Sequence, residues 1–188
     1  FLGNPFMDPV LVQQRSLPKC QNRLGLLLGS RRPDLDENLL LTLRLIETFS
    51  IVKLCKKEIS FDIPLVAALD DADLGELVAS MDWEVSFSNH HSGLQLVHNE
   101  LKVNIHRDSF SKVLQSSDVF VSMAGTAAEQ AVGLAKPVVQ LIGKGFQSNA
   151  SFAASQRRLL GPSIFYIEEI LEEEKYLIET RNLILNLF

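Results

Sequence analysis

The chain has 188 residues, of which 46% are hydrophobic and 22% charged, and its formal net charge is −5. This length suffices for one well-packed domain and is short for two, and the composition is that of an ordinary globular protein. The acidic balance argues against general nucleic-acid binding, which needs a basic face. No apolar run reaches the roughly 18 residues that a membrane-spanning helix requires.

The two cysteines, Cys20 and Cys55, do not form a C-x-x-C pair, so a zinc ribbon and a thioredoxin motif are excluded. Two free thiols fit a reducing compartment, and no signal peptide is visible, so we expect a cytoplasmic protein. The chain opens with Phe1 and the segment "FLGNPFMDP". This opening is typical of the middle of a longer protein, and we therefore expect the chain to be a fragment.

The predicted elements alternate between strands and helices. The apolar run 23–30 predicts a buried strand, and Asp34 with Glu37 resembles a capping box that starts a helix running to about Lys57. The later predictions are a strand at 62–69, a helix at 71–81, a strand at 83–87, a hairpin or two short strands within 94–106, a helix at 109–117, a strand at 118–123, a helix at 126–135, a strand at 137–142, a helix at 148–160, a strand at 163–167 and a helix at 168–188.

This alternation predicts an α/β domain with a mostly parallel sheet and helices on both faces. In such sheets ligands bind outside the carboxyl ends of the strands. Two predicted strand ends carry residues suited to a ligand, namely 29–31 and 123–126.

At the first of these strand ends, "LLLGSRR" supplies a glycine, a hydroxyl and two guanidinium groups. Gly29 lets the backbone approach a ligand closely, Ser30 offers a hydroxyl, and Arg31 and Arg32 offer forked donors for phosphate oxygens. The alternative is an ordinary corner between a strand and a helix, with solvated arginines.

At the second strand end, "MAGTAAEQ" predicts a helix that begins with small residues. Its first N–H groups, at Gly125, Thr126 and Ala127, have no partner within the helix, and the helix dipole favours an anion there. Glu129 and Gln130 follow about one turn later, where they can accept hydrogen bonds from sugar hydroxyls. The alternative is tight packing of helix on sheet, which also favours glycine and alanine.

Other nucleotide and metal motifs are missing. "LIGKGFQ" is not a P-loop, because Val138 and Gly145 stand where that motif needs glycine and Ser or Thr, and no G-x-G-x-x-G follows a strand. The adjacent His90 and His91 match no metal-ligand spacing, so no metal is expected. No G-x-S-x-G elbow indicates a hydrolase.

The motifs and their order resemble the C-terminal half of a GT-B glycosyltransferase, in particular the lipid-A-disaccharide synthase family. "FLGNPFMD" is similar to the family segment hGHPLxD, with Asn4 in place of the histidine. "LGLLLGSRRPDLDENL" is similar to LLPGSRxxE, and "SDVFVSMAGTAAEQAVGLAKPVV" to SDxxLxxSGTAxLExxLxxxPMVV. The likeness covers most of residues 1–143 and is vague between 60 and 100.

The resemblance implies a Rossmann-like donor domain that binds a UDP-sugar as substrate, without a metal or another cofactor. Ser30 and Arg31, beside Gly29, would face the diphosphate together with the helix start at Gly125, Thr126 and Ala127. The segment of Ile105, His106 and Arg107 would hold the uracil edge through backbone groups, and Gln147 would lie near the donor sugar.

The residue expected to bind the ribose differs from the family. The family has a glutamate seven residues before the proline, and Gln130 stands at that position here, with Glu129 beside it. Alignment and register favour Gln130, whereas a carboxylate accepts hydroxyl protons more strongly, which favours Glu129. Both residues stay candidates at this point.

The resemblance also implies a domain plan. Residues 1–20 would be the crossover between two domains, 21–188 the donor-binding domain, and the N-terminal domain, with the acceptor site and usually the catalytic base, would lie outside this chain. We expect the full-length protein to transfer a hexosyl group to a lipid or saccharide acceptor, with peripheral membrane contact, and this chain alone to be inactive and without a catalytic residue. The alternatives are an enzyme similar to UDP-sugar 2-epimerases and a non-catalytic module that binds nucleotide sugars.

Overall fold

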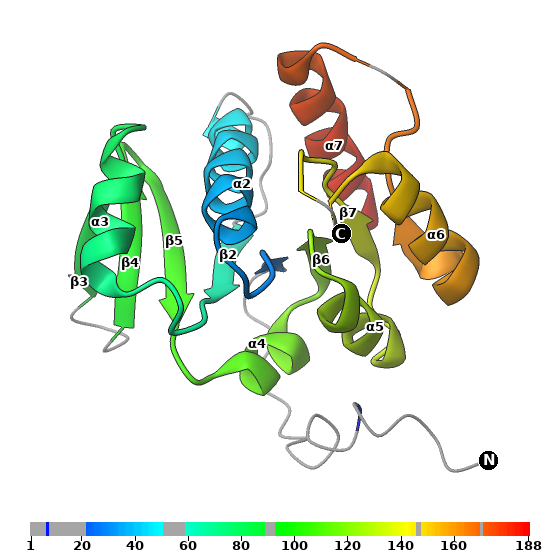
Figure 1. The fold of residues 1–188 in the computed structure, drawn as a ribbon, viewed down its shortest axis with the longest axis horizontal. Helices are drawn as coiled ribbons and strands as arrows, with labels where there is room; N and C mark the ends of the chain where they lie inside the picture. The colour runs from blue at the N-terminus through cyan, green and yellow to red at the C-terminus, as the bar shows by residue number, and fades with distance from the viewer. Residues whose placement is uncertain (1–6, 8–21, 51–58, 89–92, 146–147, 170) are drawn as a thin grey trace.

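The chain forms an α/β fold with an eight-stranded, mostly parallel sheet (Figure 1). The structure, a computed structural model, describes residue 7 and residues 22–50, 59–88, 93–145, 148–169 and 171–188. The strands are β1 (Asn22–Leu27), β2 (Ile59–Pro64), β3 (Glu84–Ser88), β4 (Gly93–His98), β5 (Leu101–His106), β6 (Val119–Ser122), β7 (Val138–Gln140) and β8 (Ile164–Phe165). The helices are α2 (Asp34–Ser50), α3 (Asp71–Ala79), α4 (Phe110–Ser116), α5 (Gly125–Gly133), α6 (Ala150–Leu160) and α7 (Glu173–Leu187), with a short 3₁₀ turn, η2, at Gly161–Ser163.

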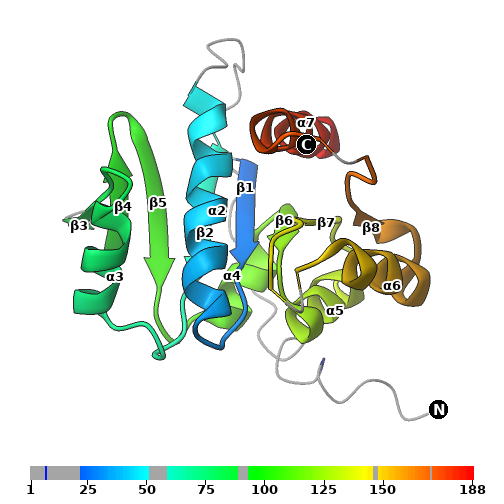
Figure 2. The ribbon, with the colours of Figure 1, turned by 45° about the horizontal axis from the view of Figure 1, so that its top comes forward.

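The strand order across the sheet is β3-β4-β5-β2-β1-β6-β7-β8. The six strands from β5 to β8 in this order are parallel, whereas β3, β4 and β5 pair antiparallel. The turn between β4 and β5 falls at Asn99 and Glu100, and Asn99 has the positive φ of 54° that a tight turn favours. The hairpin alternative for residues 94–106 is therefore confirmed. Figure 2 shows this hairpin end with α3, and α6 with β8 at the opposite end.

Alternating side chains give the sheet two apolar faces. On one face, Leu24 and Leu26 of β1 belong to a large cluster that also takes in residues of α2, α3 and α7. On the other face, Leu27 and Phe120 pack with residues of α4 and α5. Gly25 leaves room for Phe120 there, because a Cβ on Gly25 would lie 2.3 Å from the phenyl Cε1. The sheet is thus covered by helices on both faces.

The direction in which successive strands are added reverses at β1. The chain passes from β1 to β2, crosses through α3 to the edge strand β3, and comes back through β4 to β5 beside β2. It then passes through α4 to place β6 on the other side of β1. Loops that leave β1 and β6 therefore diverge to opposite faces and open a crevice at the carboxyl ends of these two strands.

Several predicted boundaries need correction. The strand predicted at 62–69 ends at Pro64, and the apolar residues after it form a turn whose Leu65 and Leu69 are buried. The last two strands are shorter than predicted, covering 138–140 and 164–165. The helix predicted to reach Lys57 is described to Ser50, because residues 51–58 lie outside the described ranges.

The predicted capping box at Asp34 is wrong. Asp34 is the first residue of α2 and lies inside the helix. The first turn is closed by backbone carbonyls, since Leu35 N donates to Arg31 O at 2.8 Å and Asp36 N donates to Pro33 O at 3.0 Å. The side chain of Asp34 is consequently available for another contact.

Among the described residues, no helix is both long and apolar enough to cross a membrane.

Candidate functional site

A pocket of about 460 Å³ lies at the carboxyl ends of β1 and β6, where the strand order reverses. It brings together the two strand ends that the sequence singled out. Its lining consists of Leu27, Leu28, Gly29, Ser30, Arg31, Asp34, Asn38, Pro64, Val66, Phe110, Met123, Ala124, Gly125, Thr126, Ala127, Gln130 and Ser148.

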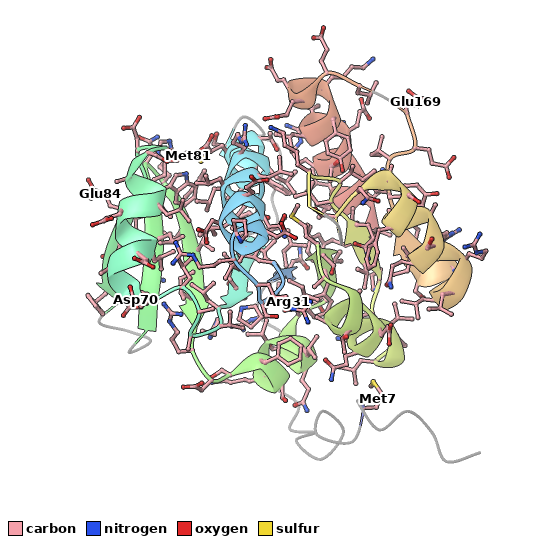
Figure 3. All side chains as sticks on the ribbon, viewed as in Figure 1. Met7, Arg31, Asp70, Met81, Glu84 and Glu169 are labelled. Atoms are coloured by element: carbon pink, nitrogen blue, oxygen red, sulfur yellow. The ribbon has the colours of Figure 1, made fainter. Side chains whose placement is uncertain are left out.

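The loop after β1 holds Gly29, Ser30 and Arg31 along one side of the pocket. Gly29 has φ = 91°, a conformation that glycine adopts without strain, and the buried Asn38 fixes the start of the loop by donating from Nδ2 to Leu28 O at 2.8 Å. Within the described residues Arg31 is exposed and has no ion-pair partner, and Figure 3 shows it beside α5. Of the two arginines, only Arg31, the one that the resemblance places at the diphosphate, lines the pocket.

The neighbouring Arg32 is engaged elsewhere. Its guanidinium forms ion pairs with Asp36, at 2.9 Å, and with Asp73 of α3. Arg32 does not line the pocket. The two adjacent arginines therefore differ in their surroundings, and Arg32 is a natural control for Arg31.

The first turn of α5 forms another side of the pocket. Its N-cap residue, Ala124, has no polar side chain, and no side-chain cap bond is made there. Ser122 orders the approach to the helix, because its Oγ accepts from Ala124 N at 3.1 Å and donates to Ala124 O at 3.0 Å. The N–H groups at residues 125–127 thus remain as donors beside the positive end of the helix dipole.

Gln130 and Glu129 differ in their relation to the pocket. Gln130 belongs to the lining, whereas Glu129 does not. Successive positions in an α-helix are turned by about 100°, so only one of the two can face the strand ends. The position of Gln130 in the pocket lining agrees with the alignment that selects Gln130 over Glu129. The role of Gln130 as a ribose ligand stays a prediction.

Ile105 and His106 lie outside this lining. Ile105 is 4% exposed in the core, and its strand is paired on both sides, with β2 and β4. The ring of His106 is directed to a buried carboxylate, since its Nε2 lies 2.7 Å from Asp62 Oδ1. Their predicted contact with the uracil edge is not apparent from the pocket, although Pro64, the register partner of His106, lines it.

Asp62 on β2 is the centre of a polar network that includes residues of the neighbouring strands β1 and β5. The residue is 1% exposed; besides His106, its Oδ1 accepts from Asn104 Nδ2 at 3.1 Å, and its Oδ2 accepts from Ser60 Oγ at 3.1 Å. Arg23 NH1 lies 3.9 Å from Oδ2. Burial acts to raise the pKa of Asp62, but the hydrogen bond from His106 and the charge of Arg23 outweigh it and hold that pKa below its usual value.

Among the pocket residues that sequence reasoning missed are Asp34 and Asn38 on α2, Phe110 on α4 and Ser148 in the loop after β7. Asp34 was assigned to a cap, and nothing in the local pattern marks Asn38, Phe110 or Ser148 as site residues. These three face the pocket only because α2, α4 and the loop after β7 converge on the strand ends. No short-range signal in the sequence could have found them.

The loop after β7 closes against α2. Gly143 N donates to Ser148 O at 2.6 Å, and the hydroxyl of Tyr176 on α7 accepts from Ile142 N, also at 2.6 Å. A Cβ on Gly145 would lie 3.2 Å from Asp34 Oδ2 and 2.9 Å from Ser148 Oγ. The carboxylate and the hydroxyl therefore both lie against the backbone of Gly145.

Some predicted features lie outside the described residues. These are Gln147, the two adjacent histidines His90 and His91, both cysteines, and the segment 1–20 apart from Met7. Met7 itself is placed against α5, where a Cβ on Gly133 would lie 2.5 Å from its Sδ (Figure 3). Over the described ranges, His, Asp and Glu side chains form no group of three that could hold a metal ion.

Comparisons of the chain with protein-family models, with curated proteins and with solved structures found no match.

Proposed function

We propose that this chain is the donor-binding domain of a glycosyltransferase, similar to the lipid-A-disaccharide synthase family, and that its pocket binds a UDP-sugar. The single observation that carries the proposal is the meeting of the Arg31 loop and the α5 N-terminus in one pocket at the reversal of strand order. The six parallel strands have the order of a Rossmann-like, doubly wound sheet, and nucleotides bind such sheets at this point.

The charges of the pocket favour a diphosphate at the α5 side. Backbone N–H groups at residues 125–127 provide donors without a side-chain cap, and the exposed Arg31 provides a forked cation. In the transfer reaction, the same groups would stabilise the negative charge that develops on the leaving UDP. A group that activates the acceptor would come from the other domain of the full-length protein.

The nucleoside would lie toward Gln130 and Phe110. The amide of Gln130 can accept from ribose hydroxyls, and an aromatic ring such as that of Phe110 suits an apolar base face. This arrangement uses both helices, α4 and α5, that cover the second face of the sheet. The hexose would then extend toward α2.

Calorimetric titration with UDP and with uridine tests the proposal. We expect UDP to bind with a Kd nearer millimolar than nanomolar, about −4 to −6 kcal/mol, because the proposed donor-binding domain would supply only part of the contacts of a complete donor cleft. Arg31→Ala should weaken UDP binding by about 1.5 to 3 kcal/mol and leave uridine binding nearly unchanged, since uridine lacks the diphosphate.

Arg32→Ala is the matched control, because it removes an adjacent guanidinium that does not line the pocket. It should change neither affinity appreciably. Absence of UDP binding by the folded protein at millimolar concentration would contradict the proposal, and so would hexosyl transfer by this chain alone. If Arg31→Ala lowers the affinity for UDP and for uridine by the same factor, Arg31 does not contact the diphosphate.

A further inference from the structure

One feature of the pocket is at odds with an anion site: it contains a carboxylate. Asp34, on the first turn of α2, belongs to the lining. Within the described residues its carboxylate makes no ion pair or hydrogen bond, whereas Asp36, two residues later, is paired with Arg32 at 2.9 Å. An unpaired carboxylate repels phosphate, so its presence favours a ligand that also brings hydrogen-bond donors to this side.

The surroundings of Asp34 differ from those of the α5 side. Asn38 lies one helical turn further along α2, and Ser148 reaches the pocket from the loop after β7. The Asp34 carboxylate and the Ser148 hydroxyl lie against the same backbone, at Gly145. A carboxylate, an amide and a hydroxyl close together are groups that hydrogen-bond to a polyol, and none of them carries a positive charge that would attract a phosphate.

The two sides of the pocket also lie on opposite faces of the sheet. The helix that carries Asp34 and Asn38 packs on the face of the large apolar cluster, whereas α5 packs on the other. A ligand that reaches both sides must therefore cross the ends of β1 and β6. A nucleotide sugar has such a form, with an anionic centre and a neutral, hydroxyl-rich end.

We infer that Asp34 binds hydroxyl groups of the hexose of the nucleotide sugar and sets the preference of the pocket for a glycosylated over a free nucleotide. This inference rests on the proposed function, because it assumes that the diphosphate lies at the α5 side. Asn38 and Ser148 complete the hexose side.

The experiment compares UDP with UDP-glucose and UDP-N-acetylglucosamine by calorimetry, using the wild type, Asp34→Asn and Glu37→Gln. Glu37 is the matched control because it is an exposed acid in the same first turn of α2 and does not line the pocket. Both substitutions remove one negative charge from the helix N-terminus, so effects on the helix dipole are common to both. Circular dichroism verifies that each variant is folded.

We expect the wild type to bind at least one UDP-hexose more tightly than UDP. Asp34→Asn should lower the affinity for that UDP-hexose by about tenfold, while the affinity for UDP stays the same or rises, and Glu37→Gln should change neither. If Asp34→Asn leaves UDP-hexose binding unchanged, or weakens both ligands by the same factor, the inference is overturned and the proposed function stands. If the folded wild type binds neither UDP nor UDP-hexose, both are overturned.

Discussion

Asp62 shows how a single buried charge is accommodated in this sheet. It lies on β2, between Arg23 on β1 and Asn104 and His106 on β5, and each of these neighbours offers a donor or a positive charge. A buried carboxylate without such partners would cost several kcal/mol. The network therefore ties three adjacent strands together on the side of the sheet opposite the large apolar cluster.

This network makes stability depend on pH in a defined direction. Because the folded-state pKa of Asp62 is lowered, its contribution is fully present above the unfolded pKa of about 4 and is lost as the pH falls through the folded value. Asp62→Asn should lower the free energy of unfolding by about 1 to 3 kcal/mol at pH 7. The difference from the wild type should shrink below about pH 4.

Urea unfolding of both proteins between pH 7 and pH 2 measures this difference. If the difference in the free energy of unfolding stays constant from pH 7 to pH 2, the charge of Asp62 does not contribute to stability. The effect of the substitution would then come from the changed hydrogen-bonding groups alone.

The two candidates for ribose binding are separated by substitution. Gln130→Ala should lower uridine affinity by about 1 kcal/mol, because a hydrogen bond to a ribose hydroxyl is lost. Gln130→Glu should keep or improve the affinity, since a carboxylate makes charge-assisted bonds to the same hydroxyls. Glu129→Ala should have little effect, because Glu129 does not line the pocket. A larger loss in Glu129→Ala than in Gln130→Ala, with both variants folded, would reverse the assignment.

Helix α5 begins without the side-chain features that stabilise a helix N-terminus. A side-chain cap at Ala124 or an acid in the first turn would stabilise the helix, and both are missing. By contrast, α3 has Asp70 as an N-cap, accepting from Asp73 N at 2.8 Å, and acidic residues in its first turn. Helix α4 resembles α5 in this respect, because it also has neither a side-chain cap bond nor an acid in its first turn.

A charge placed at this helix start should move stability and binding in opposite directions. Thr126→Glu adds a favourable interaction with the dipole of α5, about 0.3 to 1 kcal/mol, and should raise the free energy of unfolding. It should also lower UDP affinity by about tenfold or more, because the new carboxylate faces the diphosphate. Thermal denaturation and calorimetry measure the two effects.

Ala72→Glu provides the control, since Ala72 is exposed at the equivalent second position of α3 and does not line the pocket. It should leave UDP binding unchanged. If Thr126→Glu binds UDP as the wild type does, the α5 N-terminus is not the diphosphate site.

At the scale of elements, the sequence predicted best where glycine and small residues mark a strand end. The ends of β1 and β6 fell at the predicted motifs because Gly29 and Gly125 interrupt apolar runs. The end of β2 was missed because the apolar run continues into a turn with buried Leu65 and Leu69, which Arg107 holds by donating to Val66 O and Leu69 O. A buried loop and a buried strand have the same hydrophobic pattern, and only the tertiary contact distinguishes them.

The whole molecule depends on one topological event, the return of the chain across β1 to form β6. The alternation of elements predicted a mostly parallel sheet, but the order of the strands follows from packing between distant segments and could not be obtained from the pattern. The same limit applied to the site. Residues 29–31 and 125–127 carry local signals, whereas Asp34 and Ser148 join them only through the folded arrangement.

The central claim is that a UDP moiety occupies the pocket at the ends of β1 and β6. A crystal structure of the protein with bound UDP tests it most directly. We predict the diphosphate within hydrogen-bond distance of the N–H groups at residues 125–127 and of the Arg31 guanidinium, with the ribose beside Gln130. An empty pocket at saturating UDP, or UDP bound at another surface, would contradict the claim.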